Sequence, residues 1–148
     1  MKQIIFIFSI LFAFASCDND DSNTTTVESS LIIQGDFYNS MHTTKKENLV
    51  IKDQKAWSAL LASMRLIAYT NYYFPEEIID FTKYQVIAVF DEVRNYGGYS
   101  IDITKITQTK DHIVVKVEQL KTGGLNAVVT QPYHIVKIAK SDKEVVFQ

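Results

Sequence analysis

The sequence predicts one α+β domain, a mainly antiparallel β-sheet laid out as a meander and packed with one principal N-terminal amphipathic helix. Two observations support this fold class. The chain has 148 residues, of which 47% are hydrophobic, which is the size and composition of an ordinary globular domain. Its first periodic segment is helical, and from about residue 84 the apolar residues follow strand patterns. We expect the domain to span residues 31–148.

Residues 1–16 have the pattern of a lipoprotein signal peptide. Lys2 precedes a run of twelve residues, Ile4 to Ala15, in which only Ser9 is polar, and small residues stand directly before Cys17. A charged start, an apolar segment and a small-residue cleavage site are the parts of a signal peptide. The apolar run is too short for a transmembrane helix, which needs about twenty residues.

Cys17 is the only cysteine in the chain, so it has no partner for a disulfide within it. The sequence from Phe14 to Cys17 resembles the bacterial lipobox, with Phe14 in place of the usual aliphatic residue. The resemblance implies that Cys17 is lipidated, and two or three acyl chains hold a protein stably on a membrane. We therefore expect a lipid anchor in the outer membrane of a Gram-negative bacterium, on its periplasmic side or at the cell surface.

Residues 17–30 are predicted to form an acidic flexible tether after the lipidated cysteine. The segment "DNDDSNTTTVESS" that starts at Asp18 is polar and has almost no side chain to bury. Residues 18–21 also resemble the acidic export signal of surface lipoproteins, and a merely soluble tether explains them equally well.

The predicted helix begins after Asp53, which is placed to cap its first turn. Trp57, Leu60, Leu61 and Met64 follow at helical spacing and form one apolar stripe. Such a stripe is typical of a helix that packs on a core. Farther along, Pro75 and the two glutamates after it indicate the start of a short helical turn.

The predicted strands begin near residue 84. The continuous apolar run from Val86 to Phe90 indicates a central strand covered on both faces. Apolar and polar residues then alternate over 99–104 and 113–118, as in half-buried antiparallel strands. Residues 128–129, 133–138 and 145–147 continue the series. In a meander these strands place the loops at 92–98 and 121–125 at one end of the sheet and the turn at 109–111 at the other.

Two glycine pairs, Gly97-Gly98 and Gly123-Gly124, therefore lie on one predicted rim. Glycine allows positive φ and close backbone approach, and loops on a rigid sheet are common binding sites. The proline at 132 predicts a bend, a bulge or a sheet edge nearby. We expect partner binding by the rim residues Arg94, Tyr96, Gly97, Gly98, Tyr99, Gly123, Gly124, Gln131, Pro132 and Tyr133. Ordinary hairpin turns explain the glycines equally well.

The sequence gives no indication of catalysis, a metal or a cofactor. It has no G-x-S-x-G motif and no cysteine after Cys17, and His42, His112 and His134 lack metal-ligand spacing. Glu76 and Glu77 are adjacent, so their side chains point apart. The net charge of −2, with lysines 45, 46, 52 and 55 interrupted by acidic residues, argues against nucleic acid.

Several segments in this order resemble the PrcB-type domain, a family named for an accessory lipoprotein subunit of a bacterial surface protease complex. They are Trp57 on its helix, then "IDFTKYQVIAVF", "GGYSIDITKI" and "TQPYHIVKI", and together they cover roughly residues 49–147. The resemblance implies a protein that binds and stabilises a protease assembly and does not cleave peptide bonds itself. A protein partner, with a protease as the first candidate, is therefore expected.

Two other functions fit the same residues. A looser likeness to chagasin-type protease inhibitors rests on two glycine loops and a proline-aromatic loop along one edge, although only seven residues separate Gly124 from Pro132 here. A glycan or small-ligand receptor is the other alternative. It would use the tyrosines at 69, 72, 73, 96 and 99 around a concave groove.

Overall fold

The computed structural model describes residues 24–38, 44–68 and 74–148. Within these ranges the chain forms eight strands and one helix, in the order β1 (Thr25–Thr26), β2 (Ser29–Tyr38), β3 (Glu47–Ile51), α1 (Gln54–Ala68), β4 (Tyr84–Phe90), β5 (Asp102–Gln108), β6 (His112–Glu118), β7 (Thr130–Ala139) and β8 (Glu144–Phe147). The predicted signal peptide and the predicted lipidation site Cys17 lie outside the described residues. No helix in those ranges is long and apolar enough to cross a membrane.

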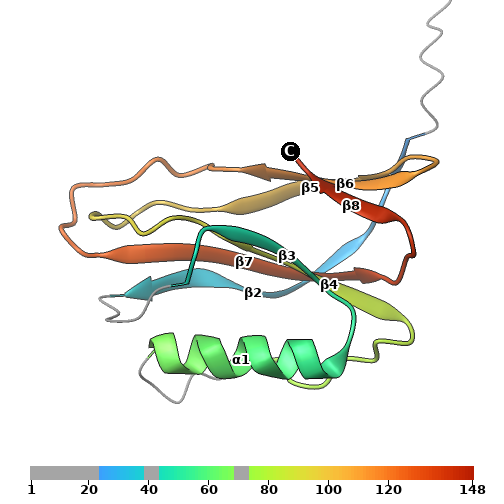
Figure 1. The fold of residues 1–148 in the computed structure, drawn as a ribbon. Helices are drawn as coiled ribbons and strands as arrows, with labels where there is room; N and C mark the ends of the chain where they lie inside the picture. The colour runs from blue at the N-terminus through green and yellow to red at the C-terminus, as the bar shows by residue number, and fades with distance from the viewer. Residues whose placement is uncertain (1–23, 39–43, 69–73) are drawn as a thin grey trace, which may run out of the picture.

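The strands form two four-stranded sheets that face each other. The first sheet has the order β1-β5-β6-β8 and the second β2-β7-β4-β3. Figure 1 shows α1 below the second sheet, so the molecule has three layers, helix on sheet on sheet. One hydrophobic core lies between α1 and the second sheet, and another lies between the two sheets.

This architecture corrects the predicted fold class. The protein is mainly β with two sheets, whereas we expected an α+β fold with one meander, and its helix lies in the middle of the chain between β3 and β4. Strands β3 and β4 and strands β5 and β6 pair as sequence neighbours, but β7 pairs with β2 and β4, and β8 lies parallel to β6. The reason is that β5, β6 and β8 bury only one face, which they place on the second sheet.

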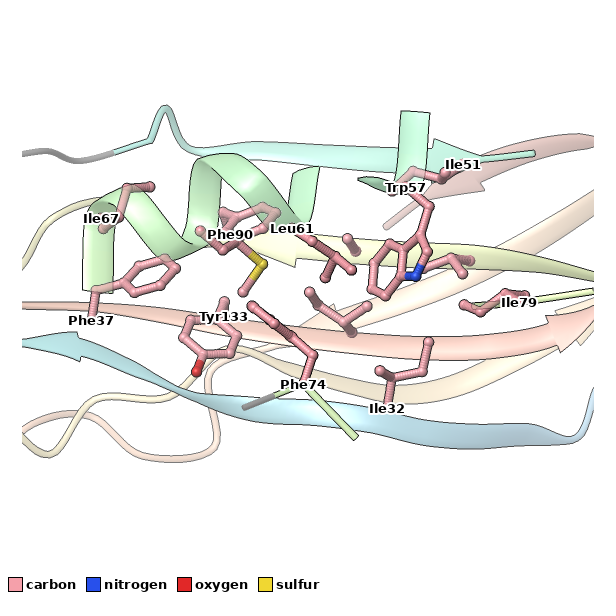
Figure 2. Packing of buried hydrophobic residues seen from close by; sticks show 14 residues of the cluster. Ile32, Phe37, Ile51, Trp57, Leu61, Ile67, Phe74, Ile79, Phe90 and Tyr133 are labelled. Atoms are coloured by element: carbon pink, nitrogen blue, oxygen red, sulfur yellow. The ribbon is translucent and has the colours of Figure 1, made fainter. Parts of the chain in front are cut away.

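Helix α1 begins where the sequence predicted. The Asp53 carboxylate accepts a hydrogen bond from the Ala56 N–H at 2.8 Å, which satisfies a free donor of the first turn. Trp57, Leu61 and Met64 are buried against the second sheet, as the close view in Figure 2 shows for the first two. The predicted apolar stripe is therefore the packing face, although Leu60 is only partly buried.

Strand β4 is the central element of the fold. All five residues from Val86 to Phe90 are fully buried, which confirms the predicted strand with two covered faces. Val86, Ala88 and Phe90 pack in the core under α1, whereas Ile87 packs between the sheets.

Several element boundaries differ from the predictions. Strands occupy residues 25–26 and 29–30, so the folded part begins inside the predicted tether, because these polar residues find backbone partners in β5 and β7. Strand β5 begins at Asp102 rather than at residue 99, and residues 128–129 belong to a loop. No helical turn follows Pro75, because Glu76 and Glu77 turn apart to bind Lys137 and Arg65.

Candidate functional site

Two long connections lie at the same end of the molecule. The first, residues 92–101, runs from β4 in the second sheet to β5 in the first. The second, residues 119–129, runs back from β6 to β7. We call these two segments the loop pair, and Figure 1 shows them extending together at the left of the view. They share an end because each crosses from one sheet to the other there.

The two glycine pairs bind each other. The Gly124 N–H donates to the Gly97 carbonyl at 2.9 Å, and the Gly123 N–H donates to the Gly98 carbonyl at 3.1 Å. The Gly97 N–H in turn donates to the Asn126 carbonyl at 2.9 Å. Both glycine pairs therefore lie on one rim, as predicted. The structure adds that the pairs join the two loops into one unit.

Glycine is required where the two loops meet for two separate reasons. Gly98 and Gly123 have φ angles of +83° and +99°, which residues with a side chain rarely adopt. A Cβ atom on Gly98 would lie 3.1 Å from the Gly124 nitrogen, and one on Gly123 would lie 2.4 Å from Cζ of Tyr99. The missing side chains therefore allow the backbones and the Tyr99 ring to approach closely.

Tyr99 and Arg94 form the side-chain part of the loop pair. The Arg94 guanidinium lies 4.8 Å from the centre of the Tyr99 ring, within the range of a cation–π contact. Arg94 also exchanges two backbone hydrogen bonds with Thr130, at 2.7 and 2.9 Å. The first loop is thereby fixed to the start of β7.

A buried aspartate anchors this end of the fold. Asp91 is only 3% exposed and directly follows β4. Its Oδ2 accepts hydrogen bonds from Arg94 at 2.8 and 3.0 Å and from Gln119 at 3.1 Å, and Lys46 lies 3.6 Å from Oδ1. Since Arg94 and Gln119 belong to different loops, one carboxylate holds both loops against β4.

Gln131 replaces the donor that Pro132 lacks. The Asp91 N–H donates to the Pro132 carbonyl at 2.9 Å, and the return bond of such a pair needs an N–H on residue 132. The Gln131 side-chain amide donates to the Asp91 carbonyl instead, at 2.9 Å. Pro132 therefore neither breaks β7 nor joins two strands, and β7 is continuous through it.

Four of the predicted partner-binding residues are buried: Gly97, Gln131, Pro132 and Tyr133. Gln131 is 1% exposed, Tyr133 is fully buried in the core under α1, and Pro132 is buried between them. Their role is to hold β7 and the loop pair in place, because a buried side chain does not meet a docked protein. The part of the predicted rim that is exposed or half-exposed is thus Arg94, Tyr96, Gly98, Tyr99, Gly123 and Gly124.

Exposed apolar side chains gather on the loop pair. Of the ten large hydrophobic residues that are exposed in the described part of the chain, five lie on these two loops: Val93, Tyr96, Leu120, Leu125 and Val129. Leu125 is fully exposed, and Tyr96 is about half exposed. Only Tyr96 among them was predicted from the sequence, although apolar residues in segments without strand alternation are a visible signal.

Ser100 has a structural position rather than that of a nucleophile. Its hydroxyl donates to Asp102 at 2.5 Å and accepts the Lys121 N–H at 3.0 Å. Burial by itself would raise the pKa of Asp102, but hydrogen bonds from Ser100, the Leu120 N–H and Gln34 outweigh it and keep this pKa below its usual value. The lowered pKa favours the ionised form of Asp102, which holds the Ser100 hydroxyl in place as a hydrogen-bond acceptor.

The histidines do not form a metal site in the part of the chain that is described. His134 is largely buried, and its Nδ1 accepts the Ile103 N–H at 3.0 Å, which joins the two sheets. Burial lowers the pKa of His134, and the nearby Asp102 opposes this shift. His112 lies at the far end beside Glu144, and His42 lies outside the described residues. No group of three potential ligands occurs among the residues described.

Comparison with protein families gives one match. The family model described as PrcB C-terminal matches residues 85–139, which run from β4 to the end of β7 and include both loops of the loop pair. No curated protein and no solved structure matches the chain.

Proposed function

Because the PrcB C-terminal family model matches residues 85–139, we propose that this protein is a non-enzymatic accessory subunit that binds a protease complex through the loop pair. At the level of the family, the domain indicates an accessory role in a protease complex. The finer proposal, that the loop pair is the docking surface, rests on one observation about this chain. Five exposed apolar side chains lie on two loops that are bonded to each other.

Exposed apolar residues are common on any protein, and single ones need no explanation. Here they gather on loops that are held by backbone bonds between the glycines and by the buried Asp91. Loops fixed in this way lose little conformational entropy when a partner binds, so their apolar area contributes more fully to affinity. Tyr38, the last residue of β2, adds a further exposed ring beside Thr130 at the same end.

We further propose that the protein is held in the outer membrane by lipid on Cys17, as the sequence predicts. The first described strand begins at Thr25, eight positions after Cys17 in the sequence. Such an anchor would keep the domain close to a membrane-bound protease, which raises the effective concentration of the two partners.

The two alternatives receive less support from the geometry. A chagasin-like inhibitor needs a proline-aromatic loop next to the glycine loops, but Pro132 and Tyr133 are buried in β7. A glycan receptor needs exposed aromatic faces around a groove, whereas the Tyr99 ring is covered by Arg94 and Gly123. The tyrosines at 69, 72 and 73 lie outside the described residues.

The docking proposal is tested with the full-length tagged chain as bait in detergent-solubilised envelope. The loop variant is Tyr96→Ser combined with Leu125→Ser, since both side chains are exposed and their loss should not affect folding. Leu66→Ser, on the exposed side of α1, is the matched control. We expect the wild type and the control to retain a protease subunit and the loop variant to lose it. Equal retention by all three proteins would refute docking through the loop pair.

The activity of the retained protease separates the accessory role from inhibition. With an accessory subunit, the protease should survive longer at its working temperature and keep or gain activity when the wild-type chain is added. An inhibitor would lower activity in proportion to the chain added. Loss of activity would therefore refute the accessory role while leaving the docking surface in place.

A further inference from the structure

A polar cleft opens beside the loop pair. It has a volume of about 390 Å³. Its lining includes Gln34 and Asp36 of β2, Tyr99 of the first loop, Asp102 at the start of β5, and Lys121 of the second loop. Alternation along β2 explains the position. Phe37 points into the core under α1, so Gln34 and Asp36 point toward the other sheet. The cleft is thus continuous with the loops that carry the exposed apolar residues.

The two carboxylates in this cleft differ in how well they are satisfied. Asp102 accepts hydrogen bonds from Ser100, from the Leu120 N–H at 3.1 Å and from Gln34 at 2.8 Å. Within the described part of the chain, Asp36 accepts only a long bond of 3.5 Å, from the Tyr38 hydroxyl to Oδ2. Its Oδ1 is buried and has no hydrogen-bond partner among the described residues.

An undersatisfied carboxylate of this kind costs free energy until a donor reaches it. Burial raises the pKa of Asp36, while the Tyr38 hydroxyl and the charge of Lys121 only partly offset this. Two carboxylates and one ammonium group line the cleft, so it retains a net negative charge. Lys121 is exposed and remains free to turn toward solvent.

We propose that this cleft receives an arginine or lysine side chain of the partner segment that lies on the loop pair. The inference rests on the proposed function, because it names the chemistry of the segment that docks there. A basic side chain would pair with the Asp36 carboxylate through charge-assisted hydrogen bonds, which a guanidinium provides best. Apolar neighbours of that residue in the partner would cover Tyr38 and the exposed residues of the loop pair.

The test uses a library of random peptides displayed on phage and selected on the full-length chain. Parallel selections use Asp36→Asn, which keeps the shape and removes the charge. Asp111→Asn, in the exposed turn between β5 and β6, is the matched control. We expect wild-type and control selections to enrich peptides with one arginine or lysine among apolar residues. A selected peptide should bind Asp36→Asn about tenfold more weakly.

A second readout reports direct contact. The carboxyl carbon of Asp36, followed by NMR during a pH titration, should show a lower pKa when the selected peptide is bound, because a nearby cation favours the ionised form. An unchanged pKa would overturn the inference even if the peptide carries a basic residue.

The outcomes separate this inference from the proposed function. Peptides that lose binding to Tyr96→Ser with Leu125→Ser, yet show no basic preference and bind Asp36→Asn normally, would overturn the cleft and leave the docking surface. Basic peptides that depend on Asp36 and ignore the loop substitutions would support the cleft and contradict docking on the loop pair. Failure to select any peptide at this end would overturn both.

Discussion

The two ends of the paired sheets hold their connections in different ways. At the loop-pair end, the glycine backbones of two separate loops bind each other, and Asp91 holds both loops to β4. At the other end, the turn between β5 and β6 is held mainly by bonds within itself, with one bond from the Lys143 ammonium group to the Thr109 carbonyl at 2.7 Å. The Thr109 hydroxyl accepts the N–H groups of Asp111 and His112 at 3.3 and 3.0 Å, and the Thr109 N–H donates to the His112 carbonyl at 2.8 Å.

This difference separates a turn that connects two neighbouring strands from the loop pair, for which we propose a docking role. A local turn needs only three or four residues, and this one carries no large exposed apolar side chain. The loop pair needs bonds between residues far apart in the sequence, and it carries exposed apolar side chains that the fold does not use. Long ordered loops of this kind usually carry function.

The largest effect on this comparison is expected from Gly98→Val. Valine strongly disfavours a φ of +83°, and its Cβ would lie 3.1 Å from the Gly124 nitrogen. We expect a loss of about 3 kcal/mol in the free energy of unfolding, measured by urea denaturation. Lys110→Val in the opposite turn should change it by less than about 0.5 kcal/mol. Similar losses in both variants would contradict a special role for the bonded glycine pairs.

A smaller loss is expected from Asp91→Asn. The substitution removes the charge that holds Arg94 and Lys46 and weakens the bond from Gln119. We expect a cost of about 2 kcal/mol in unfolding free energy. Faster amide hydrogen exchange should appear in both loops, because one carboxylate anchors both. Exchange that increases in the first loop alone would show that Gln119 does not depend on Asp91.

At the opposite end, Thr109→Val should cost about 1 kcal/mol, because valine has the same shape but cannot accept the two N–H groups. Thermal unfolding measures the loss. Capture of the partner protein should remain at the wild-type level, since the substitution lies far from the loop pair. Reduced capture would indicate that the two ends are coupled.

The smallest effect is a pH dependence that originates at His134. Burial lowers the pKa of His134 in the folded state, so the unfolded chain binds more protons as the pH falls below about 6.5. Stability should therefore be complete above that pH and decrease below it, as measured by urea midpoints between pH 7.5 and 5. His134→Asn keeps an acceptor near the position of Nδ1 and removes the titration. An equal slope in both proteins would assign the pH dependence to another group.

Much of the local structure could be predicted from the sequence. The spacing of Trp57, Leu61 and Met64 predicts a helix with one packing face, and the run from Val86 to Phe90 predicts a strand covered on both sides. Both patterns follow from the geometry of a single element, so no knowledge of its neighbours is needed. The position of the glycine pairs on one rim was also predicted.

The candidate site was predicted only in part for the same reason. Glycine pairs are visible in a sequence, but the bond from Gln131 to the Asp91 carbonyl joins residues forty positions apart. The residues from 131 to 133 look like a proline loop, and only the pairing of β7 with β2 and β4 buries them. The exposure of Leu125 likewise depends on where the loop leaves the sheets.

The sequence by itself thus determined the type of most elements, the family resemblance and the location of the glycine-rich rim, because each depends on residue type and spacing. Tertiary structure alone decided that the strands divide between two sheets, that β8 joins β6 in parallel, and that Asp36 remains without a full set of donors. The physical reason is that backbone groups in strands pair at almost any sequence separation. The choice among pairings is made by how the whole chain buries its apolar faces.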